Sequence, residues 1–252
     1  IYMQAISAYP VVNMVDFGRF TRGCNIVDEK FPNTRLDTLY KNACQMVVGS
    51  GAPTDDLGMR RWSFLEFIVR AANDKYRDRG LATTTTEAVR KFLTNNLLGK
   101  NFVEPWQEFR KLYIWTLPVN DLLKVNLHLL DEIYEKYASK NKRLQFDQSC
   151  KIFTTYSNLA LSMEHSKFCF AMSKMTTVNE STTLTLMVME FVEFLEMICR
   201  VADIKFRGSN LETEELQTKV GYVLDELMPL IGARKVEVDC HELEISDSDE
   251  DY

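Results

Sequence analysis

WSFLEFIVRAANDKYR, residues 62–77, is the stretch that decides the fold, because it returns at residues 192–207 as VEFLEMICRVADIKFR. At a fixed offset of 130, eight positions of a fourteen-residue window are identical. They are Phe64, Leu65, Glu66, Ile68, Arg70, Ala72, Lys75 and Arg77, matched by Phe194, Leu195, Glu196, Ile198, Arg200, Ala202, Lys205 and Arg207. The chain has no low-complexity bias, so chance is a poor explanation. A repeated unit is therefore predicted.

Both copies carry an apolar stripe with the spacing of a helix. The stripe consists of Phe64, Ile68, Ala71 and Ala72 in the first copy and of Phe194, Ile198, Val201 and Ala202 in the second. The charged residues fall off this stripe. Each copy is therefore predicted to be the last, core-facing helix of its unit.

The segments in front of these two helices also correspond. VDFGRFTRGCNIV (15–27) is matched by LQFDQSCKIFTTY (144–156), with Leu144 and Phe146 in the places of Val15 and Phe17. We expect a short extended step that runs into a helix in both. The next helix, predicted over 34–48, has its match in 164–175.

Further helices surround the two repeats. TTTTEAVRKFLTNNLLG (83–99) begins with a capping box of Thr84 and Glu87, and 211–232 is its counterpart. A helix over 104–115 is expected to bridge the halves. The second half also has a long amphipathic helix at 121–141. Its counterpart would precede residue 9, which suggests a truncated N-terminus.

The predicted fold class is all-α, with two tandem units that are each followed by an extra helix. The predicted domains are a first pair of helical hairpins at 1–82, bridging helices at 83–118, a second pair at 119–208, a trailing helix at 209–233 and an acidic tail at 234–252.

Composition and charge exclude several classes of protein. The 252 residues are 46% hydrophobic and 26% charged, an ordinary globular balance, with enough length for two domains of about 100 residues. Neither a membrane-spanning run nor a signal peptide is apparent. The net charge is −6, but the eight acids after residue 236 have no basic neighbour, so the body is close to neutral. No nucleic-acid partner and no membrane partner are expected.

Catalytic chemistry has no recognisable motif here. The six cysteines form no CxxC pair and are expected to be reduced, mostly buried thiols. Cys240 and His241 are adjacent but lie in the polar tail, and His128 and His165 lie on predicted helices without acid or metal companions. There is no phosphate loop, GxSxG or HExxH. The protein is predicted not to be an enzyme, and no catalytic, cofactor-binding or metal site is assigned.

An apolar–x–Phe–x–x–apolar step at the start of an exit helix is how an EF-hand leaves its loop. VDFGRF, LQFDQSC and MEFVEFLEMI have this pattern. The chain resembles the tandem EF-hand family, and more narrowly the degenerate EF-hand pairs of ciliary and flagellar axoneme-associated proteins. The resemblance covers most of residues 9–232. It implies two EF-hand-like pairs, a cytoplasmic, cytoskeletal location in the axoneme, and tubulin or other axonemal subunits as partners.

The calcium ligands of that family are missing from all four loops. A working loop needs Asp or Asn at positions 1, 3 and 5, Gly at 6 and a bidentate Glu at 12. We place Val15, Met59, Leu144 and Met189 at position 8 of the first to the fourth loop. Positions 1 and 12 are then Ala8 and Arg19 in the first loop, Ala52 and Ser63 in the second, Tyr137 and Gln148 in the third, and Thr182 and Glu193 in the fourth. Positions 3 and 5 are Ser139 and Asn141 in the third loop, Leu184 and Leu186 in the fourth. No calcium cofactor is therefore expected.

The preferred function is that of a non-catalytic structural or adaptor protein, and a calmodulin-like calcium sensor is the alternative. The methionines suit either an adaptable groove or, preferably, core packing. Trp106, Phe109 and Trp115 suit a docking surface or, preferably, the seal between the two units. Ser246 and Ser248 precede acidic residues and suit an acid-directed kinase, against the alternative of a solubilising tail.

Overall fold

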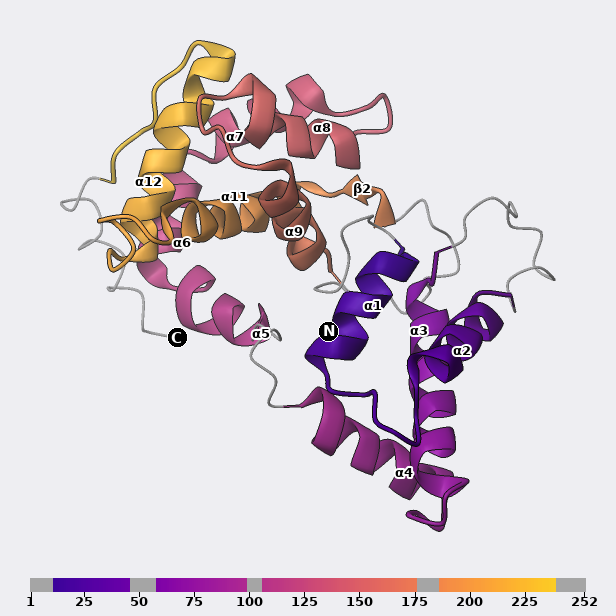
Figure 1. Ribbon diagram of the computed structural model, residues 1–252. Helices are drawn as coiled ribbons and strands as arrows, with labels where there is room; N and C mark the ends of the chain where they lie inside the picture. The colour runs from indigo at the N-terminus through magenta and orange to yellow at the C-terminus, as the bar shows by residue number, and fades with distance from the viewer. Residues whose placement is uncertain (1–10, 46–57, 99–105, 176–185, 239–252) are drawn as a thin grey trace, which may run out of the picture. The chain divides into compact units, whose positions relative to one another are not determined.

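The computed structural model describes residues 11–45, 58–98, 106–175 and 186–238, which are mostly helical (Figure 1). The chain divides into two compact units, residues 1–104 and residues 105–252. The division falls inside the stretch 83–118, which was predicted to bridge the two repeats. The all-α fold class is confirmed, while a small antiparallel strand pair accompanies the helices of the second unit.

The described residues of unit 1 form four helical segments, two of which end in a π-helical turn. They are α1 (Met14–Gly23), α2 (Asn33–Gln45), α3 (Arg61–Ala72) with η3 (Asn73–Arg77), and α4 (Thr85–Phe92) with η4 (Leu93–Leu97). Helix α3 is the first of the repeated stretches, and it packs against both α2 and α4.

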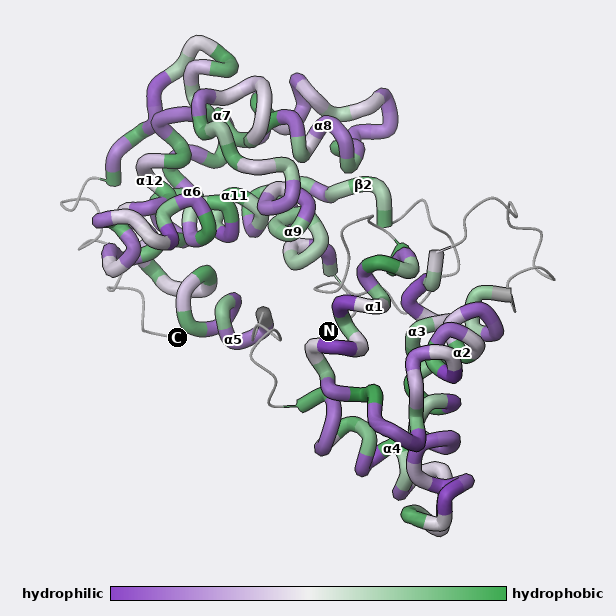
Figure 2. The backbone as a smooth tube through the Cα atoms, in the orientation of Figure 1, coloured by the Kyte–Doolittle hydropathy of each residue, from purple (hydrophilic) through white to green (hydrophobic). Residues whose placement is uncertain are grey.

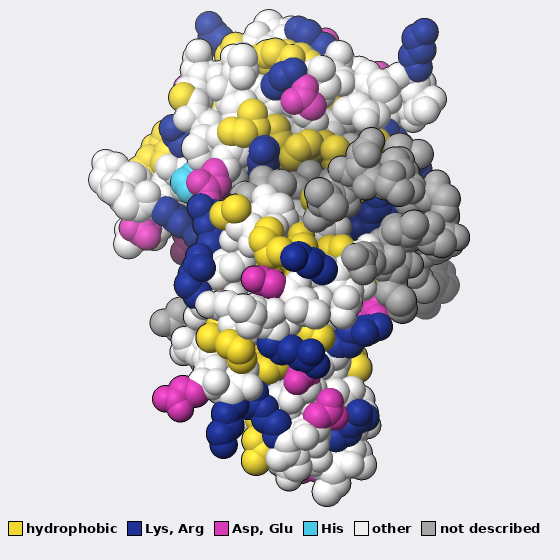
Figure 3. Space-filling view, turned by 45° about the vertical axis from the view of Figure 1, so that its right-hand side comes forward, with side chains coloured by type: hydrophobic (Ala, Val, Ile, Leu, Met, Phe, Trp, Pro, Cys, Tyr) yellow, Lys and Arg dark blue, Asp and Glu magenta, His cyan; other side chains and the backbone are white. Residues whose placement is uncertain are grey.

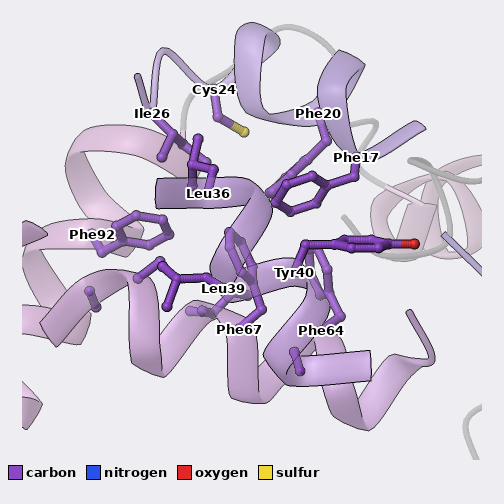
Figure 4. Close-up of a cluster of buried hydrophobic side chains, with 14 of the residues drawn as sticks. Phe17, Phe20, Cys24, Ile26, Leu36, Leu39, Tyr40, Phe64, Phe67 and Phe92 are labelled. Atoms are coloured by element: carbon purple, nitrogen blue, oxygen red, sulfur yellow. The ribbon is translucent and has the colours of Figure 1, made fainter. Parts of the chain in front are cut away.

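Aromatic rings from three helices meet in the core of unit 1 (Figure 4). The ring of Phe17 on α1 stands edge-on to Phe67 on α3 at 4.9 Å, and Phe20 packs against Phe64 at 5.2 Å. Tyr40 on α2 contacts Phe17 and donates a hydrogen bond from its hydroxyl to the carbonyl of Val12. Buried aromatic pairs of this kind add roughly 1 kcal/mol each beyond their burial. They join α1 to α3.

The described residues of unit 2 follow the same plan, with four more helical elements in front. The leading elements are α5 (Trp106–Phe109), η5 (Arg110–Ile114), α6 (Leu117–Val125) and α7 (Leu127–Tyr137). The shared plan follows as β1 (Leu144–Gln145), α8 (Phe146–Lys151), η6 (Ile152–Tyr156), α9 (Met163–Ser173), β2 (Val188–Met189), α11 (Phe191–Phe206), α12 (Leu216–Leu227) and η7 (Met228–Ile231). Helix α11 packs against α9 and α12.

The apolar stripes of the two repeated helices are buried. Every stripe residue of α3 and α11 is less than 9% exposed, and Ala71, Ala72, Phe194, Ile198, Val201 and Ala202 have no exposed surface. Figure 2 shows apolar and polar residues alternating along the helices, as expected where one face is buried. The prediction of two core-facing helices is confirmed.

An antiparallel contact joins the two hairpins of each unit. In unit 2, β1 pairs with β2 so that Leu144 lies opposite Met189. In unit 1 an isolated bridge joins Val12 to Met59. Val15 is predicted to make this contact, but Val12, three residues earlier, makes it instead, so that prediction is wrong. The helix already begins at Met14, because the side chain of Asn13 accepts a hydrogen bond from Asp16 N at 2.8 Å. Val15 is therefore an exposed helical residue.

The single helix predicted over 121–141 is also wrong. It is divided at Asn126 into α6 and α7. The buried Asn126 amide donates to Leu122 O at 2.9 Å and to Val236 O at 2.8 Å, and its oxygen accepts from Val236 N at 2.6 Å. A residue assigned to the acidic tail is thus fixed to unit 2, while residues 239–252 lie outside the described residues.

Candidate protein-binding site

Unit 2 carries an open groove of about 900 Å³ between the η5–α6 connection and the start of α11. Four large apolar side chains that line it are exposed: Trp115 (63%), Leu117 (70%), Val192 (58%) and Met175 (47%). Covering apolar side chains of this size with a partner lowers the free energy of the complex. A cluster of such exposed side chains therefore marks an interaction site. We define the groove by these four residues and its charged base.

Local structure places the aromatic side of the groove. The π-helical turn η5 ends at Ile114, and the next residue, Trp115, leaves helical geometry (φ −85°, ψ 47°). Helix α6 begins two residues later, with Pro118 in its first turn, a position where the missing N–H of proline costs nothing. The sharp turn between two helices leaves Trp115 and Leu117 outside the core.

The base of the groove is a buried charge cluster. Arg110 Nε lies 2.8 and 2.7 Å from the two carboxylate oxygens of Glu196, and Arg200 Nε lies 2.8 Å from Glu196 Oε1. The three side chains are 8%, 7% and 6% exposed. The guanidinium of Arg200 also lies over the ring of Phe109, 5.2 Å from its centroid. This cluster fixes the orientation of η5 on α11, since a buried charge must keep its partners.

Glu193, the acid expected at position 12 of the fourth loop, is bonded within the protein. Lys174 Nζ lies 2.5 Å from Glu193 Oε2, and the main-chain nitrogens of Met175 and Glu190 donate to its two oxygens at 2.8 and 2.9 Å. Lys174 also donates to Val188 O at 2.6 Å. The ammonium therefore supplies the positive charge that a calcium ion supplies to a working loop, and the carboxylate is 4% exposed.

The third loop uses its candidate ligands for other contacts. The Tyr137 ring stacks on Tyr156 at 5.1 Å, and Ser139 Oγ donates to Arg143 O at 2.9 Å. Gln148, at position 12, accepts a hydrogen bond from the Tyr156 hydroxyl at 3.1 Å. These aromatic and hydroxyl groups do not provide the anionic oxygen ligands that Ca²⁺ prefers.

The first loop has a corrected register. With Val12 at position 8, position 12 is the buried Asp16 in place of Arg19, while positions 1, 3 and 5 become Ala5, Ser7 and Tyr9. These three residues lie outside the described residues, as do Ala8, Ala52, Thr182 and Leu184. Leu186 and the buried Ser63 carry no carboxylate. The described residues contain no group of three or more His, Cys, Asp or Glu side chains that could hold a metal ion.

The remaining candidate residues are dispersed. His128 and His165 are exposed on α7 and α9. Met172, Met189 and Met197 belong to the core, whereas Met175 lines the groove and Met187 is half-buried. The Trp106 side chain, Cys240, His241, Ser246 and Ser248 lie outside the described residues.

The thiols of Cys150, Cys169 and Cys199, which lie in the described part of unit 2, are buried. Burial raises the pKa of Cys150 to about 11 and that of Cys199 to about 12, and it also raises the pKa of Cys169. A thiol that stays protonated is a poor nucleophile and a poor metal ligand. Cys24, Cys44, Cys150, Cys169 and Cys199 are all free thiols.

The visible surface mixes charge types. On the face drawn in Figure 3, basic, acidic and apolar side chains are interspersed. Of the helices described, none combines the length and the apolar run that crossing a bilayer requires. Comparison with family models, curated proteins and solved structures gives no match.

Proposed function

We propose that the chain is a non-catalytic structural or adaptor protein that binds protein partners through two tandem, degenerate EF-hand-like pairs. The groove of unit 2 carries this proposal. It presents Trp115, Leu117, Val192 and Met175 to solvent above a buried, rigid charge cluster. An apolar groove of this kind suits the apolar face of a partner helix.

The EF-hand-like interpretation is supported by the repeated plan of the units. Each has a short antiparallel contact, Val12 with Met59 and Leu144 with Met189, where the two loops of an EF-hand pair would meet. Glu193 follows Met189 by four residues, as the last ligand of a calcium loop would.

The alternative is a calcium-responsive sensor of the calmodulin type. The bond between Lys174 and Glu193 favours the adaptor, because calcium would have to displace an ammonium from a buried carboxylate. Calorimetry with Ca²⁺ separates the two functions. The adaptor predicts no saturable heat at micromolar Ca²⁺, whereas micromolar binding would establish the sensor.

The proposed location is the axoneme of cilia or flagella, with tubulin or another axonemal subunit as the partner. This part rests on the resemblance of the repeated helices to axonemal EF-hand proteins. The test is the position of the full-length, tagged protein in a ciliated cell, followed by stepwise extraction of axonemes with detergent and salt. Retention on the doublets at high salt supports a built-in component. A protein that is soluble or absent from cilia contradicts the location.

The groove itself is tested with a paired variant, Trp115→Ala with Leu117→Ser. The matched control is Leu127→Ser, an exposed leucine at the start of α7 that does not line the groove. We expect the groove variant to lose partners found by proximity labelling while its thermal unfolding stays unchanged. If both variants retain the same partners, the groove is not the binding site.

A further inference from the structure

The outer face of α3 in unit 1 corresponds in sequence to a largely covered face of α11 in unit 2, with three of its five residues identical. It consists of Trp62, Leu65, Glu66, Val69 and Arg70, which recur along one side of the helix at intervals of three and four. At the offset of 130, their counterparts are Val192, Leu195, Glu196, Cys199 and Arg200. We call these five residues of unit 1 the α3 outer face.

The two faces differ in burial. Leu65 is 59% exposed and Val69 is 40% exposed, whereas Leu195 is half-buried and Cys199 is fully buried. The Arg70 side chain is 40% exposed, against 6% for Arg200. The part of the helix surface that carries Leu195, Glu196, Cys199 and Arg200 is therefore covered in unit 2 and more open in unit 1, whereas Val192 (58%) is more exposed than Trp62 (38%) because it lies in the open groove.

The cover in unit 2 comes from Phe109 and Arg110. Arg110 gives Glu196 a second guanidinium, and Phe109 lies against Arg200. Ile114, one helical turn after Arg110, is buried. In unit 1, Glu66 pairs with Arg70 at 2.6 Å, and none of the described residues supplies it with a second guanidinium or places an aromatic ring on Arg70.

We propose that the α3 outer face binds a helix of a separate protein in which an aromatic residue is followed directly by arginine. The arginine would pair with Glu66 and the ring would cover Arg70. An apolar residue one turn later would cover Leu65 and Val69. This inference rests on the adaptor function only in requiring a protein partner, and it is independent of the groove and of the axonemal location.

The chemistry of the occupant follows from the charges. A Glu–Arg pair on one helix leaves carboxylate lone pairs that suit a planar guanidinium, which binds a carboxylate through two parallel hydrogen bonds. A lysine-bearing helix would lack that second bond. A purely apolar helix would bury Glu66 and Arg70 without giving either a new partner, which costs free energy.

The probe is a peptide that copies residues 106–117, WQEFRKLYIWTL, with a benzoylphenylalanine in place of the phenylalanine. It is photo-crosslinked to the full chain, and the adduct is located after trypsin digestion. Trypsin releases residues 62–70 as one fragment and residues 175–200 as another, so the two repeats are told apart by mass. We expect saturable crosslinking to the 62–70 fragment.

Variants of the chain and of the peptide test whether the peptide binds specifically to the α3 outer face. Leu65→Asp should abolish crosslinking, and Glu66→Gln should weaken peptide binding about tenfold, as expected for the loss of a charged hydrogen bond. Leu81→Asp, at a leucine of unit 1 that is 56% exposed and outside the face, should leave binding unchanged. A peptide with glutamine in place of its arginine should bind as weakly as the wild-type peptide binds to Glu66→Gln.

Three results would overturn the proposal. Crosslinks confined to residues 175–200 would mean that the peptide replaces its own copy in unit 2. A full chain that forms dimers, and loses them in Leu65→Asp, would make a second copy the occupant. Absence of saturable crosslinking to residues 62–70 would mean that the face does not recognise this helix chemistry, and the tests of the groove and of calcium binding would be unaffected.

Discussion

Lys75 and Lys205 occupy the same position of the two repeated helices and make the same hydrogen bond. Lys75 Nζ donates to Ile26 O at 2.6 Å, and Lys205 Nζ donates to Leu159 O at 2.7 Å. Each acceptor lies next to a residue with left-handed backbone, Asn25 (φ 50°) or Ala160 (φ 48°), in the loop after the first helix of the shared plan. The repeated lysine thus holds a loop with a left-handed residue in both units, across 49 residues in unit 1 and 46 in unit 2.

Replacing the two lysines with methionine should destabilise the units unequally. Lys75→Met removes a hydrogen bond and an ion pair with Asp28 at a buried position, and we expect a loss of about 1–3 kcal/mol. Lys205→Met removes one bond at a more exposed position, and about 1 kcal/mol is expected. Urea unfolding measures both, with the exposed Lys41→Met as the control. A larger loss for Lys205→Met would contradict this account.

The repeated glutamates should differ even more. Glu196→Gln leaves Arg110 and Arg200 buried without their carboxylate, and a loss of about 3–5 kcal/mol is expected. Glu66→Gln affects a partly exposed pair within one helix, and less than about 1 kcal/mol is expected. Thermal and urea unfolding of the two variants make a matched comparison. Equal losses of unfolding free energy in the two variants would mean that burial does not determine how much each Glu–Arg pair stabilises the protein.

The N-terminus of α4 should respond to acid. Hydrogen bonds from Lys91, then from the main chain and hydroxyl of Thr83, lower the pKa of Glu87 from 4.5 to about 2. A depressed pKa stabilises the fold fully above pH 4.5, and this contribution is lost as the pH falls toward 2. Carboxyl NMR titration measures it.

Variants around Glu87 sharpen that measurement. Lys91→Met should raise the pKa more than Thr83→Val, and Thr86→Val, at an exposed neighbour on the same helix, should leave it unchanged. The predicted capping box forms in part: Thr84 Oγ1 accepts from Glu87 N at 3.1 Å, but the Glu87 carboxylate accepts from Thr83 N and not from Thr84 N. A Glu87 pKa near 4.5 would contradict the observed hydrogen bonds.

Thiol labelling should follow burial. Cys44 is half-buried on α2, whereas Cys24, Cys150, Cys169 and Cys199 are buried. Among these five we expect Cys44 to react first with a disulfide reagent at pH 8, because a reagent must reach the sulfur and find it as the thiolate. The other four should react only as fast as the chain unfolds. Mass spectrometry locates each label, and rapid labelling of Cys169 or Cys199 in the folded protein would contradict the described core.

Local sequence signals account for much of the fold and fail at identifiable places. The stripes of α3 and α11, and the bridge residues Met59, Leu144 and Met189, follow from periodicity and the repeat. Val15 fits the apolar pattern of the extended step, but the cap formed by Asn13 on Asp16 N starts the helix before it. The break at Asn126 has no such signal, since its amide is satisfied by Val236, 110 residues away.

By itself the sequence determined which faces of the helices are buried and that two related units exist, because apolar spacing and internal identity are properties of neighbouring residues. The candidate site was decided by tertiary structure. Arg110 meets Glu196 across 86 residues, and Lys174 meets Glu193 across 19. Glu66 and Glu196 lie in closely similar stretches of sequence, yet Glu196 is covered by η5 whereas Glu66 stays partly exposed. Burial and charge pairing depend on what packs against a helix, and that is settled only when distant segments fold together.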